Sequence, residues 1–218
     1  MVDLDDGPRR FAKADPDFAQ AAKGLAVYKP GRGERPLWDY PPDLYRREVA
    51  AAVVDEALRW SLVPPTVIRD GPFGLGSLQE FIAAADDEHY FTLLERPEHH
   101  HALKAVCIFD LLINNGDRKS GHCLLGLDGR IRAIDHGLSL HAEPKLRTVI
   151  WDFAGQAMPT DLLADVEGLI SRPEALVGLE PLIDETERAA LLRRGAAIVS
   201  SGTFPPLRSS RSYPWPLV

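Results

Sequence analysis

The stretch LINNGDRKSGHCLLGLDGRIRAIDHGL, residues 112–138, decides how the chain can be interpreted. It places two acidic residues, Asp117 and Asp135, near the two ends of a predicted tight hairpin. The LDG segment at residues 127–129 is a good hairpin turn, because it supplies the residue types that two-strand turns prefer. A domain that only has to stay folded has little use for so many polar groups beside apolar strands. The stretch therefore indicates chemistry that needs two carboxylates.

Size and charge restrict the classes of function. The chain has 218 residues, 45% of them hydrophobic, which supports one sizeable core or a large lobe with a small one attached. A formal net charge of −7 and a pI of about 5.5 argue against nucleic acid as the main partner, because phosphate binding requires a basic face. No apolar run approaches the roughly 20 residues of a membrane span, and the start MVDLDDGPRR is too polar for a signal peptide. We therefore expect no integral membrane contact.

Cysteine and histidine patterns do not predict a separate metal or nucleophile site. Cys107 and Cys123 lie in apolar segments without metal-site spacing, so buried thiols in a reducing compartment, and a cytoplasmic protein, are expected. Adjacent histidines at residues 99–101 cannot all face one ion on regular structure, which favours a solvated loop. Cys123 follows His122 directly, and neighbouring strand positions point to opposite faces, so a Cys-His dyad is not expected.

Hydrophobic periodicity and the positions of Pro and Gly predict the order of elements. The clearest helix covers residues 43–60, and Asp43 is its expected N-cap. The remaining predicted elements are strands at residues 24–29, 63–69, 77–82, 123–125 and 131–134, helices at 102–113 and through 160–200, and a short helix before residue 23 capped by Asp15 or Asp17. GPFGLG at residues 71–76 is predicted to be a hairpin turn rather than a phosphate loop, because a strand follows it.

This order predicts an α+β chain in two lobes. The small N-terminal lobe would cover residues 1–83, and a mainly helical lobe carrying the hairpin would cover residues 84–218. The join is expected near residues 81–85. The Pro-rich C-terminal tail is expected to run across the surface.

Phosphoryl transfer from a nucleotide needs parts that appear here in order. One cation steadies the phosphates, an acid orients the acceptor hydroxyl, and hard oxygen ligands hold magnesium. Lys29 ends a strand, Glu48 lies in the next helix, and Asp117 and Asp135 supply the acids. Each residue also has a purely structural alternative. Lys29 could be a solvated lysine, and Glu48 could form a surface pair with a neighbouring arginine. Asp117 could form a salt bridge with Arg118, and Asp135 could cap a turn.

NNGDRKSGH followed by IDHG resembles the catalytic loop and metal-binding segment of the phosphatidylinositol 3- and 4-kinase superfamily. The chain is closer still to a family of small actinobacterial proteins described as phosphatidylinositol kinase-like, which share YKPGRGERPLWDYP, REVAA, VPPTVIRDGPFG and KLRTVIW. The resemblance covers roughly residues 25–218. It implies an atypical protein-kinase-like fold that uses ATP with Mg²⁺, or with Mn²⁺.

The resemblance also implies roles for matching residues. Lys29 would contact the phosphates with Glu48 as its helix partner, and Asp117 would be the catalytic aspartate in a loop supported by Arg118. The hinge whose backbone meets the adenine would consist of Gln79, Glu80, Phe81 and Ile82.

The metal site and the small lobe depart from the pattern of the larger kinases. Asp135 would be the principal magnesium ligand, and His122 stands where those kinases place a metal-binding Asn. Imidazole suits manganese or zinc better than magnesium. Only 28 residues precede Lys29, and residues 1–23 contain neither a glycine-rich loop nor two convincing strands, so the small lobe is expected to be cut short.

Three functions follow. The first is an ATP- and metal-dependent phosphotransferase whose acceptor is a protein or a small molecule; a lipid is less favoured, because no membrane-binding amphipathic segment is visible. The second is a pseudokinase that serves as a nucleotide-binding or protein-interaction module, favoured by the missing glycine-rich loop and opposed by the retained Asp117 and Asp135. The third and weakest is a zinc- or manganese-dependent hydrolase. No G-x-S-x-G elbow supports a serine hydrolase.

Overall fold

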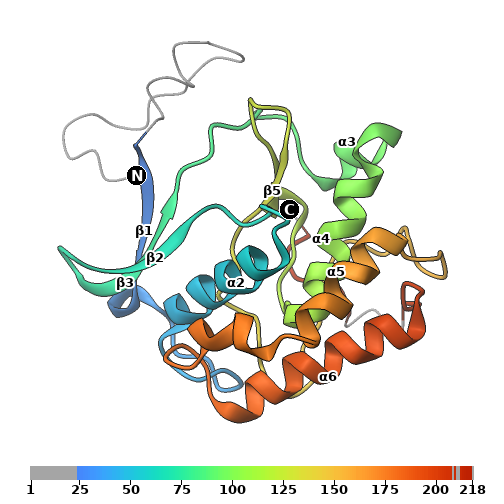
Figure 1. Ribbon diagram of the computed structural model, residues 1–218. Helices are drawn as coiled ribbons and strands as arrows, with labels where there is room; N and C mark the ends of the chain where they lie inside the picture. Colours follow the sequence, from blue (N-terminus) through green and yellow to red (C-terminus); the bar gives the residue numbers. More distant parts are fainter. Residues whose placement is uncertain (1–23, 208, 210–211, 218) are drawn as a thin grey trace.

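A small antiparallel sheet stands at one side of the computed structural model, which describes residues 24–207, 209 and 212–217. Its strands are β1 (Ala26–Pro30), β2 (Thr66–Gly71) and β3 (Gly74–Glu80), in the order β1-β3-β2 (Figure 1). The hairpin turn predicted within residues 71–76 is confirmed, since Gly71 pairs with Gly74. β2 begins after two prolines rather than at residue 63, because proline cannot donate to the ladder. The predicted helix before residue 23 lies outside the described residues.

Lys29 is placed by a close approach between β1 and β3. Lys29 is opposite Ser77, and Pro30 is opposite Gly76. A Cβ atom on Gly76 would lie 2.4 Å from the Lys29 carbonyl oxygen, so only glycine allows the two backbones this spacing.

The first long helix, α2 (Leu44–Leu58), is capped by a residue that the sequence did not indicate. Asp43 adopts a left-handed conformation and makes no side-chain cap, so the predicted N-cap is wrong. The loop after β1, which begins with η1 (Gly31–Gly33), instead folds back so that Glu34 caps the helix. Its carboxylate accepts hydrogen bonds from the backbone N–H groups of Leu44 and Tyr45 at 2.8 and 2.7 Å.

The remaining helices form the helical part of the chain, and they include α4, most of whose residues are buried. They are α3 (Tyr90–Leu94), η2 (Pro97–His99), α4 (His100–Ile113), α5 (Thr160–Ile170), η4 (Pro173–Leu179) and α6 (Glu185–Ser201). The prediction that residues 160–200 are helical is confirmed, with breaks before η4 and before α6, near Pro173 and Pro181. The histidines at residues 99–101, in contrast, lie at the end of η2 and the start of α4 instead of in a loop.

The predicted hairpin is confirmed. It follows η3 (Ser120–His122) and consists of β4 (Cys123–Leu125) and β5 (Ile131–Ala133). Gly129 has a φ of 77°, which the tight turn requires. The connecting segment at residues 83–85 bonds to this hairpin through Ala83 and Ala85. The hairpin is thereby joined to the end of the N-terminal sheet.

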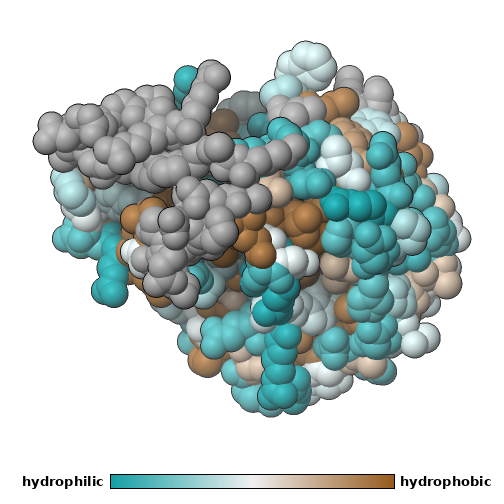
Figure 2. Space-filling view, turned by 90° about the horizontal axis from the view of Figure 1, so that it is seen from above, coloured by the Kyte–Doolittle hydropathy of each residue, from teal (hydrophilic) through white to brown (hydrophobic). Residues whose placement is uncertain are grey.

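α2 lies between the sheet and the helical part, contacting β2 and β3 on one side and η4 and α5 on the other (Figure 1). The chain is thus a mixed α and β structure with a small sheet and several helices, and the boundary at residue 83 stays a prediction. Both cysteines are buried thiols, as expected. No described helix has the length and apolar character needed to cross a membrane. Figure 2 shows mostly hydrophilic residues on the upper face, with hydrophobic residues gathered near its centre.

The C-terminal tail returns to the loop that precedes the hairpin. The Leu217 carbonyl accepts a hydrogen bond from the Ser120 N–H at 2.9 Å, and the Ser212 carbonyl accepts one from the Thr148 N–H at 3.0 Å. Phe204 is buried in the core. The tail therefore packs against the segment that carries the predicted catalytic residues.

Candidate active site

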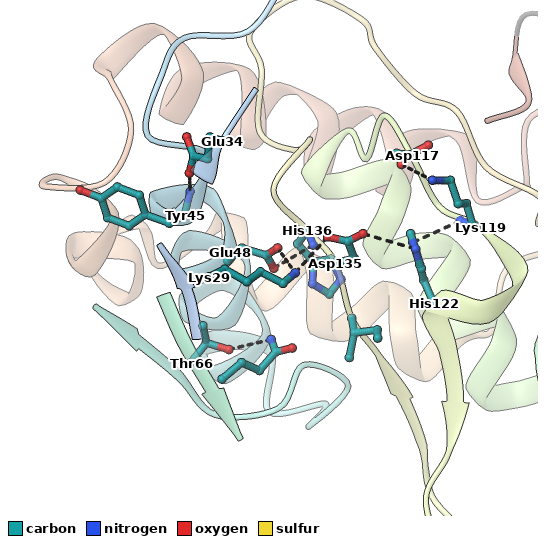
Figure 3. A network of polar contacts seen from close by, with 12 residues as sticks. Lys29, Glu34, Tyr45, Glu48, Thr66, Asp117, Lys119, His122, Asp135 and His136 are labelled. Carbon is teal, nitrogen blue, oxygen red and sulfur yellow. Dashed lines mark hydrogen bonds and ion pairs between the residues drawn. The ribbon is translucent and has the colours of Figure 1, made fainter. Parts of the chain in front are cut away.

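Lys29 lies between two carboxylates contributed by distant parts of the chain. Its Nζ is 2.5 Å from Oε1 of Glu48 on α2 and 2.9 Å from Oδ1 of Asp135, which follows β5. Figure 3 shows the lysine reaching from β1 toward both acids. Burial acts to lower the pKa of Lys29, but the two carboxylates outweigh it and leave the pKa raised, so the ammonium is charged at neutral pH. The sequence paired Lys29 with Glu48, and the structure adds Asp135.

Glu48 is the buried member of this cluster. Its side chain is only 4% exposed, and its Oε2 accepts a hydrogen bond from the His136 backbone N–H at 2.9 Å. Burial raises the pKa of the Glu48 carboxyl, and the charge of Lys29 acts in the opposite direction. Because one carboxylate holds both Lys29 and the segment after Asp135, Glu48 fixes the position of β1 relative to the hairpin.

Asp135 presents its carboxylate to solvent in an unusual backbone conformation. Its φ is 62°, in the left-handed region that favours glycine, and its side chain is 46% exposed. Burial acts to raise its pKa, but Lys29 and then His122 outweigh this and lower the pKa to about 2. An aspartate held ionised in a strained conformation at a cavity is typical of a functional site.

His122 lies beside Asp135 as a neutral imidazole rather than as a charged ion-pair partner. Burial and then the charge of Arg118 lower the pKa of His122 to about 4, so the imidazole is neutral at pH 7. Its Nδ1 faces the Lys119 backbone N–H at 3.4 Å, which places the ring proton on Nε2, 3.3 Å from Asp135 Oδ2. A metal bound at Nε2 would require the other tautomer, with two N–H groups facing each other at Nδ1. The geometry thus fits a role in orienting Asp135.

Arg118 supports the loop and cannot touch a substrate. Its side chain is completely buried, and its Nε and Nη2 bond to the two carboxylate oxygens of Asp110 on α4 at 2.9 and 2.8 Å. Nη1 donates to the Ile134 carbonyl at 2.8 Å, and Nη2 also meets Nε2 of His136 at 2.8 Å. Its contacts are those of a residue that positions the Asp117 loop, which is the support that the resemblance implies, and they leave no N–H group to meet a substrate directly.

Asp117 lies at the edge of a cavity together with Lys29 and Asp135. The Asp117 backbone N–H donates to the Asn115 side-chain oxygen at 3.0 Å, and Lys119 Nζ is 3.1 Å from the Asp117 carboxylate. Burial raises the pKa of Asp117, and Lys119 acts in the opposite direction. The loop therefore aims a second carboxylate at the space that Asp135 faces.

The predicted hinge residues are largely committed to the sheet. The Gln79 side chain is buried and donates to Thr66 at 2.8 Å. The backbone N–H groups of Glu80 and Phe81 donate to the carbonyls of Pro65 and Leu25 at 2.9 and 3.1 Å. These two backbone donors are therefore not available to an adenine in this structure, because β3 is the central strand and its end is paired on both sides.

The sequence analysis missed the loop that follows Lys29. A cavity of about 270 Å³ is lined by residues of this loop as well as by the predicted site; its lining comprises Lys29, Glu34, Arg35, Leu37, Leu44, Tyr45, Glu48, Asp117, Asp135, Gly137 and Leu138. Arg35 is exposed, and no carboxylate among the described residues forms an ion pair with it. The signal was the RGER sequence at residues 32–35, which begins three residues after a candidate phosphate-binding lysine and which composition alone marks as a solvated loop.

A metal site built by protein groups alone is absent from the described part of the chain. Within residues 24–207, 209 and 212–217, no three His, Cys, Asp or Glu side chains are arranged to hold a metal ion. Asp135 and Asp117 nevertheless line one cavity, and Asp135 is ionised. Magnesium that arrives with a nucleotide needs only one or two carboxylates, because phosphate oxygens and water complete its shell.

Comparison with known proteins places the chain in a family. No family model matches it. Over 229 aligned residues it is 38% identical to Protein Rv2133c of Mycobacterium tuberculosis, and the alignment spans 87% of this chain and 81% of the mycobacterial protein. The chain belongs to the family of Rv2133c. The name Rv2133c states no activity, so family membership leaves the chemistry to be argued from the site.

One solved structure with a similar arrangement is the crystal structure of the Helicobacter pylori proinflammatory kinase CtkA. It matches with a TM-score of 0.48 and 13% sequence identity, covering 75% of this chain and 83% of that chain. A likeness of this size carries no argument about the Rv2133c family.

Proposed function

We propose that the chain is an ATP-dependent phosphotransferase whose small sheet and helical part form a kinase-like site. The observation that carries this proposal is the position of Lys29, which is charged, partly exposed and held between Glu48 and Asp135 at a cavity that Asp117 also lines. Two carboxylates and a lysine from three separate elements serve no evident packing purpose there. They match the groups that phosphoryl transfer requires.

Each residue has a separate task in the proposed reaction. Lys29 binds the nucleotide's phosphates, and Glu48 orients Lys29 from its buried position. Asp117 accepts the proton of the acceptor hydroxyl as the hydroxyl oxygen forms its bond to the γ-phosphorus. The bond between the γ-phosphorus and the β,γ-bridging oxygen breaks, and ADP leaves with that electron pair. Arg35, which lines the same cavity, adds a second cation near the phosphates.

A divalent cation fits this donor set as a partner of the nucleotide. Asp135 would hold it, because its carboxylate is ionised, half-exposed and facing the cavity. When bound, Mg²⁺ or Mn²⁺ would offset the negative charge of the phosphates. Neutral His122 places its Nε2 3.3 Å from the Asp135 carboxylate, so we assign His122 to orienting that carboxylate.

A nucleotide-binding or protein-interaction module without catalysis is the second candidate. The engagement of the Glu80 and Phe81 backbone N–H groups within the protein favours the protein-interaction form of this module, because it leaves fewer donors for an adenine. The two candidates differ in one measurable property, turnover.

Thermal-shift titration with ATP and Mg²⁺ or Mn²⁺, combined with an assay of ADP release, tests the proposal. Binding to the native state raises the melting temperature by mass action, so wild type should shift and Asp135→Asn should not. Asp117→Asn should keep the shift and lose ADP release, because it alters proton acceptance rather than phosphate binding. A shift without any ADP release from wild type would favour the non-catalytic module. No shift with any nucleotide and metal would exclude the phosphotransferase and the nucleotide-binding module, and would leave only a protein-interaction module.

A further inference from the structure

A second, larger cavity adjoins the loop that carries Asp117. Its volume is about 900 Å³, within the range of sites for small molecules. Its apolar lining includes Leu111, Leu146, Trp151, Met158 and Ile198, together with two prolines of the C-terminal tail. The smaller cavity at Lys29 has about 270 Å³. The larger one has room for a ligand's body, which the smaller one lacks once it holds phosphates.

The charges around this larger cavity are opposite in sign to the charge of the protein. The chain has a formal net charge of −7. The cavity is nevertheless lined by the four basic residues Lys145, Arg147, Arg193 and Arg194 and by one acidic residue, Asp39. Asp39 is 3.6 Å from Lys145 Nζ, so it offsets only one of the four. A cationic patch in an acidic protein attracts an anionic ligand.

Arg194 gives the strongest sign of a missing partner. Its Nε and Nη1 donate to the carbonyls of Leu112 and His141 at 2.8 and 3.2 Å, while its Nη2 is buried and has no hydrogen-bond partner among the described residues. No described carboxylate lies within ion-pair distance of its guanidinium. A partly buried cation without an ion-pair partner is unfavourable, and an anion in the cavity would supply that partner.

The two cavities meet at the same two loops. In the loop after β1, Leu37 lines the smaller cavity and the next two residues, Trp38 and Asp39, line the larger one. On the other side, the Arg147 N–H donates to the Asn115 carbonyl at 2.9 Å, and the Arg147 carbonyl accepts from the Arg118 N–H at 3.0 Å. The basic segment of the larger cavity is therefore hydrogen-bonded directly to the Asp117 loop.

We propose that this larger cavity binds a small organic anion with an apolar body, and that this anion is the acceptor of the phosphoryl group. The second half of this statement rests on the proposed function; the binding site itself does not. The carboxylate, sulfonate or phosphate of the ligand lies among Lys145, Arg147, Arg193 and Arg194. Its aromatic or alkyl body lies against the apolar lining, which leaves a hydroxyl to face Asp117.

Fluorescence titration with 6-hydroxy-2-naphthoate tests the site, with 2-naphthol as the neutral counterpart. The naphthoate should bind at least about tenfold more tightly than 2-naphthol, because only the naphthoate carries the anion. Arg193→Glu should weaken naphthoate binding roughly tenfold, whereas Arg69→Glu, the same change on an exposed arginine of β2, should not. Equal binding of both probes, or equal effects of both substitutions, would overturn the proposal.

A matched pair on α6 tests the location. Ala197 lines the cavity and Ala196 does not, although both are exposed on the same helix. Ala197→Trp should fill the cavity and abolish naphthoate binding, while Ala196→Trp should leave it unchanged. Sedimentation velocity excludes the competing occupant: a wild-type dimer that Ala197→Trp converts to a monomer would show that a second copy fills the cavity, and would overturn the proposal.

The acceptor role requires that both cavities be filled together. Naphthoate affinity should be equal, or higher, in the presence of AMP-PNP with Mg²⁺, whereas mutual exclusion would overturn the acceptor assignment. Ala197→Trp should retain the thermal shift with ATP. If wild type binds naphthoate but shows no thermal shift with ATP, the proposed function is refuted and the anion site is not. The two failures are therefore distinguishable.

Discussion

Two cation–carboxylate pairs lie a short distance apart in this protein and differ in almost every physical respect. Arg118 and Asp110 are 0% and 1% exposed, and the arginine's N–H groups are used inside the protein. Lys29 and Asp135 are 39% and 46% exposed and line a cavity. Arg118 and Asp110 can change partners only if the protein unfolds locally. Lys29 and Asp135 can separate from each other when Lys29 binds a phosphate and Asp135 binds a cation.

The buried pair serves the structure of the protein, and the exposed pair serves the proposed reaction. The buried pair joins α4, the Asp117 loop and the end of β5, and so fixes where the acids stand. The exposed pair contributes little to stability, because solvent screens partly exposed charges. Substitutions should therefore have opposite consequences at the two places, with stability lost at the first and function lost at the second.

The largest effect is expected for Asp110→Ala. The substitution leaves Arg118 buried and unpaired, which should lower the free energy of unfolding by about 3–5 kcal/mol. Urea denaturation followed by circular dichroism measures this loss. The double variant Asp110→Leu with Arg118→Met should recover much of it, because no charge then remains buried. A loss below about 1 kcal/mol for Asp110→Ala would show that the buried pair does not hold the loop.

A smaller and pH-dependent effect is expected for Lys29→Met. Without the lysine, only the hydrogen bond from the His136 N–H opposes the effect of burial on the Glu48 carboxyl, and its pKa rises further above the value in the unfolded chain. Such a group stabilises the fold below the unfolded pKa, and this contribution is lost as pH rises through the folded pKa. The variant should thus lose stability from about pH 4.5 upward, by on the order of 1–3 kcal/mol. Denaturation midpoints of variant and wild type that stay parallel across pH 4–8 would contradict this.

His122 should contribute a moderate acid sensitivity. Its pKa is lowered to about 4 in the folded protein, against about 6.5 in the unfolded chain. The contribution is present above pH 6.5 and is lost as pH falls toward 4, because the unfolded chain then binds the proton first. His122→Gln, which keeps an amide donor near Asp135, should remove about 1–2 kcal/mol of that pH dependence. An unchanged slope between pH 6.5 and 4 in the variant would refute the neutral assignment.

Asp135→Asn should affect stability least. Its folded pKa of about 2 lies below its usual value of 3.8, so the carboxylate stabilises the fold above about pH 4, and this is lost as pH falls toward 2. At pH 7 the variant should be within about 1 kcal/mol of wild type, because the pair is partly exposed. Urea denaturation midpoints at pH 7 and pH 3 measure the stability difference at neutral pH and its change in acid. A loss of unfolding free energy above about 3 kcal/mol at neutral pH would show that Asp135 stabilises the fold as the buried Arg118–Asp110 pair does.

The local elements were predictable where sequence pattern and packing agree. The hairpin at residues 123–133, α2 and α4 follow from turn residues and apolar periodicity. Interactions between residues far apart in the sequence were not predictable by such patterns. The Glu34 cap replaces the expected Asp43 because the loop after β1 folds back onto α2, and the Glu80 and Phe81 donors are used because β3 lies in the centre of the sheet. The sequence paired Lys29 with Glu48, but only the fold shows that Asp135 also lies within hydrogen-bonding distance of Lys29.

Calorimetric titration of wild type and Lys29→Met with ATP, ADP, AMP and adenosine, each with Mg²⁺, tests the central claim most directly. If Lys29 binds the phosphates, the affinity of wild type should fall steadily from ATP through ADP and AMP to adenosine. Lys29→Met should lose the preference for ATP, while its weak affinity for adenosine should equal that of wild type. Circular dichroism at the pH of the titration should first show that the variant is folded. Equal ATP affinity in both proteins, or no ATP binding by wild type, would contradict the assignment of this cavity to nucleotide phosphates.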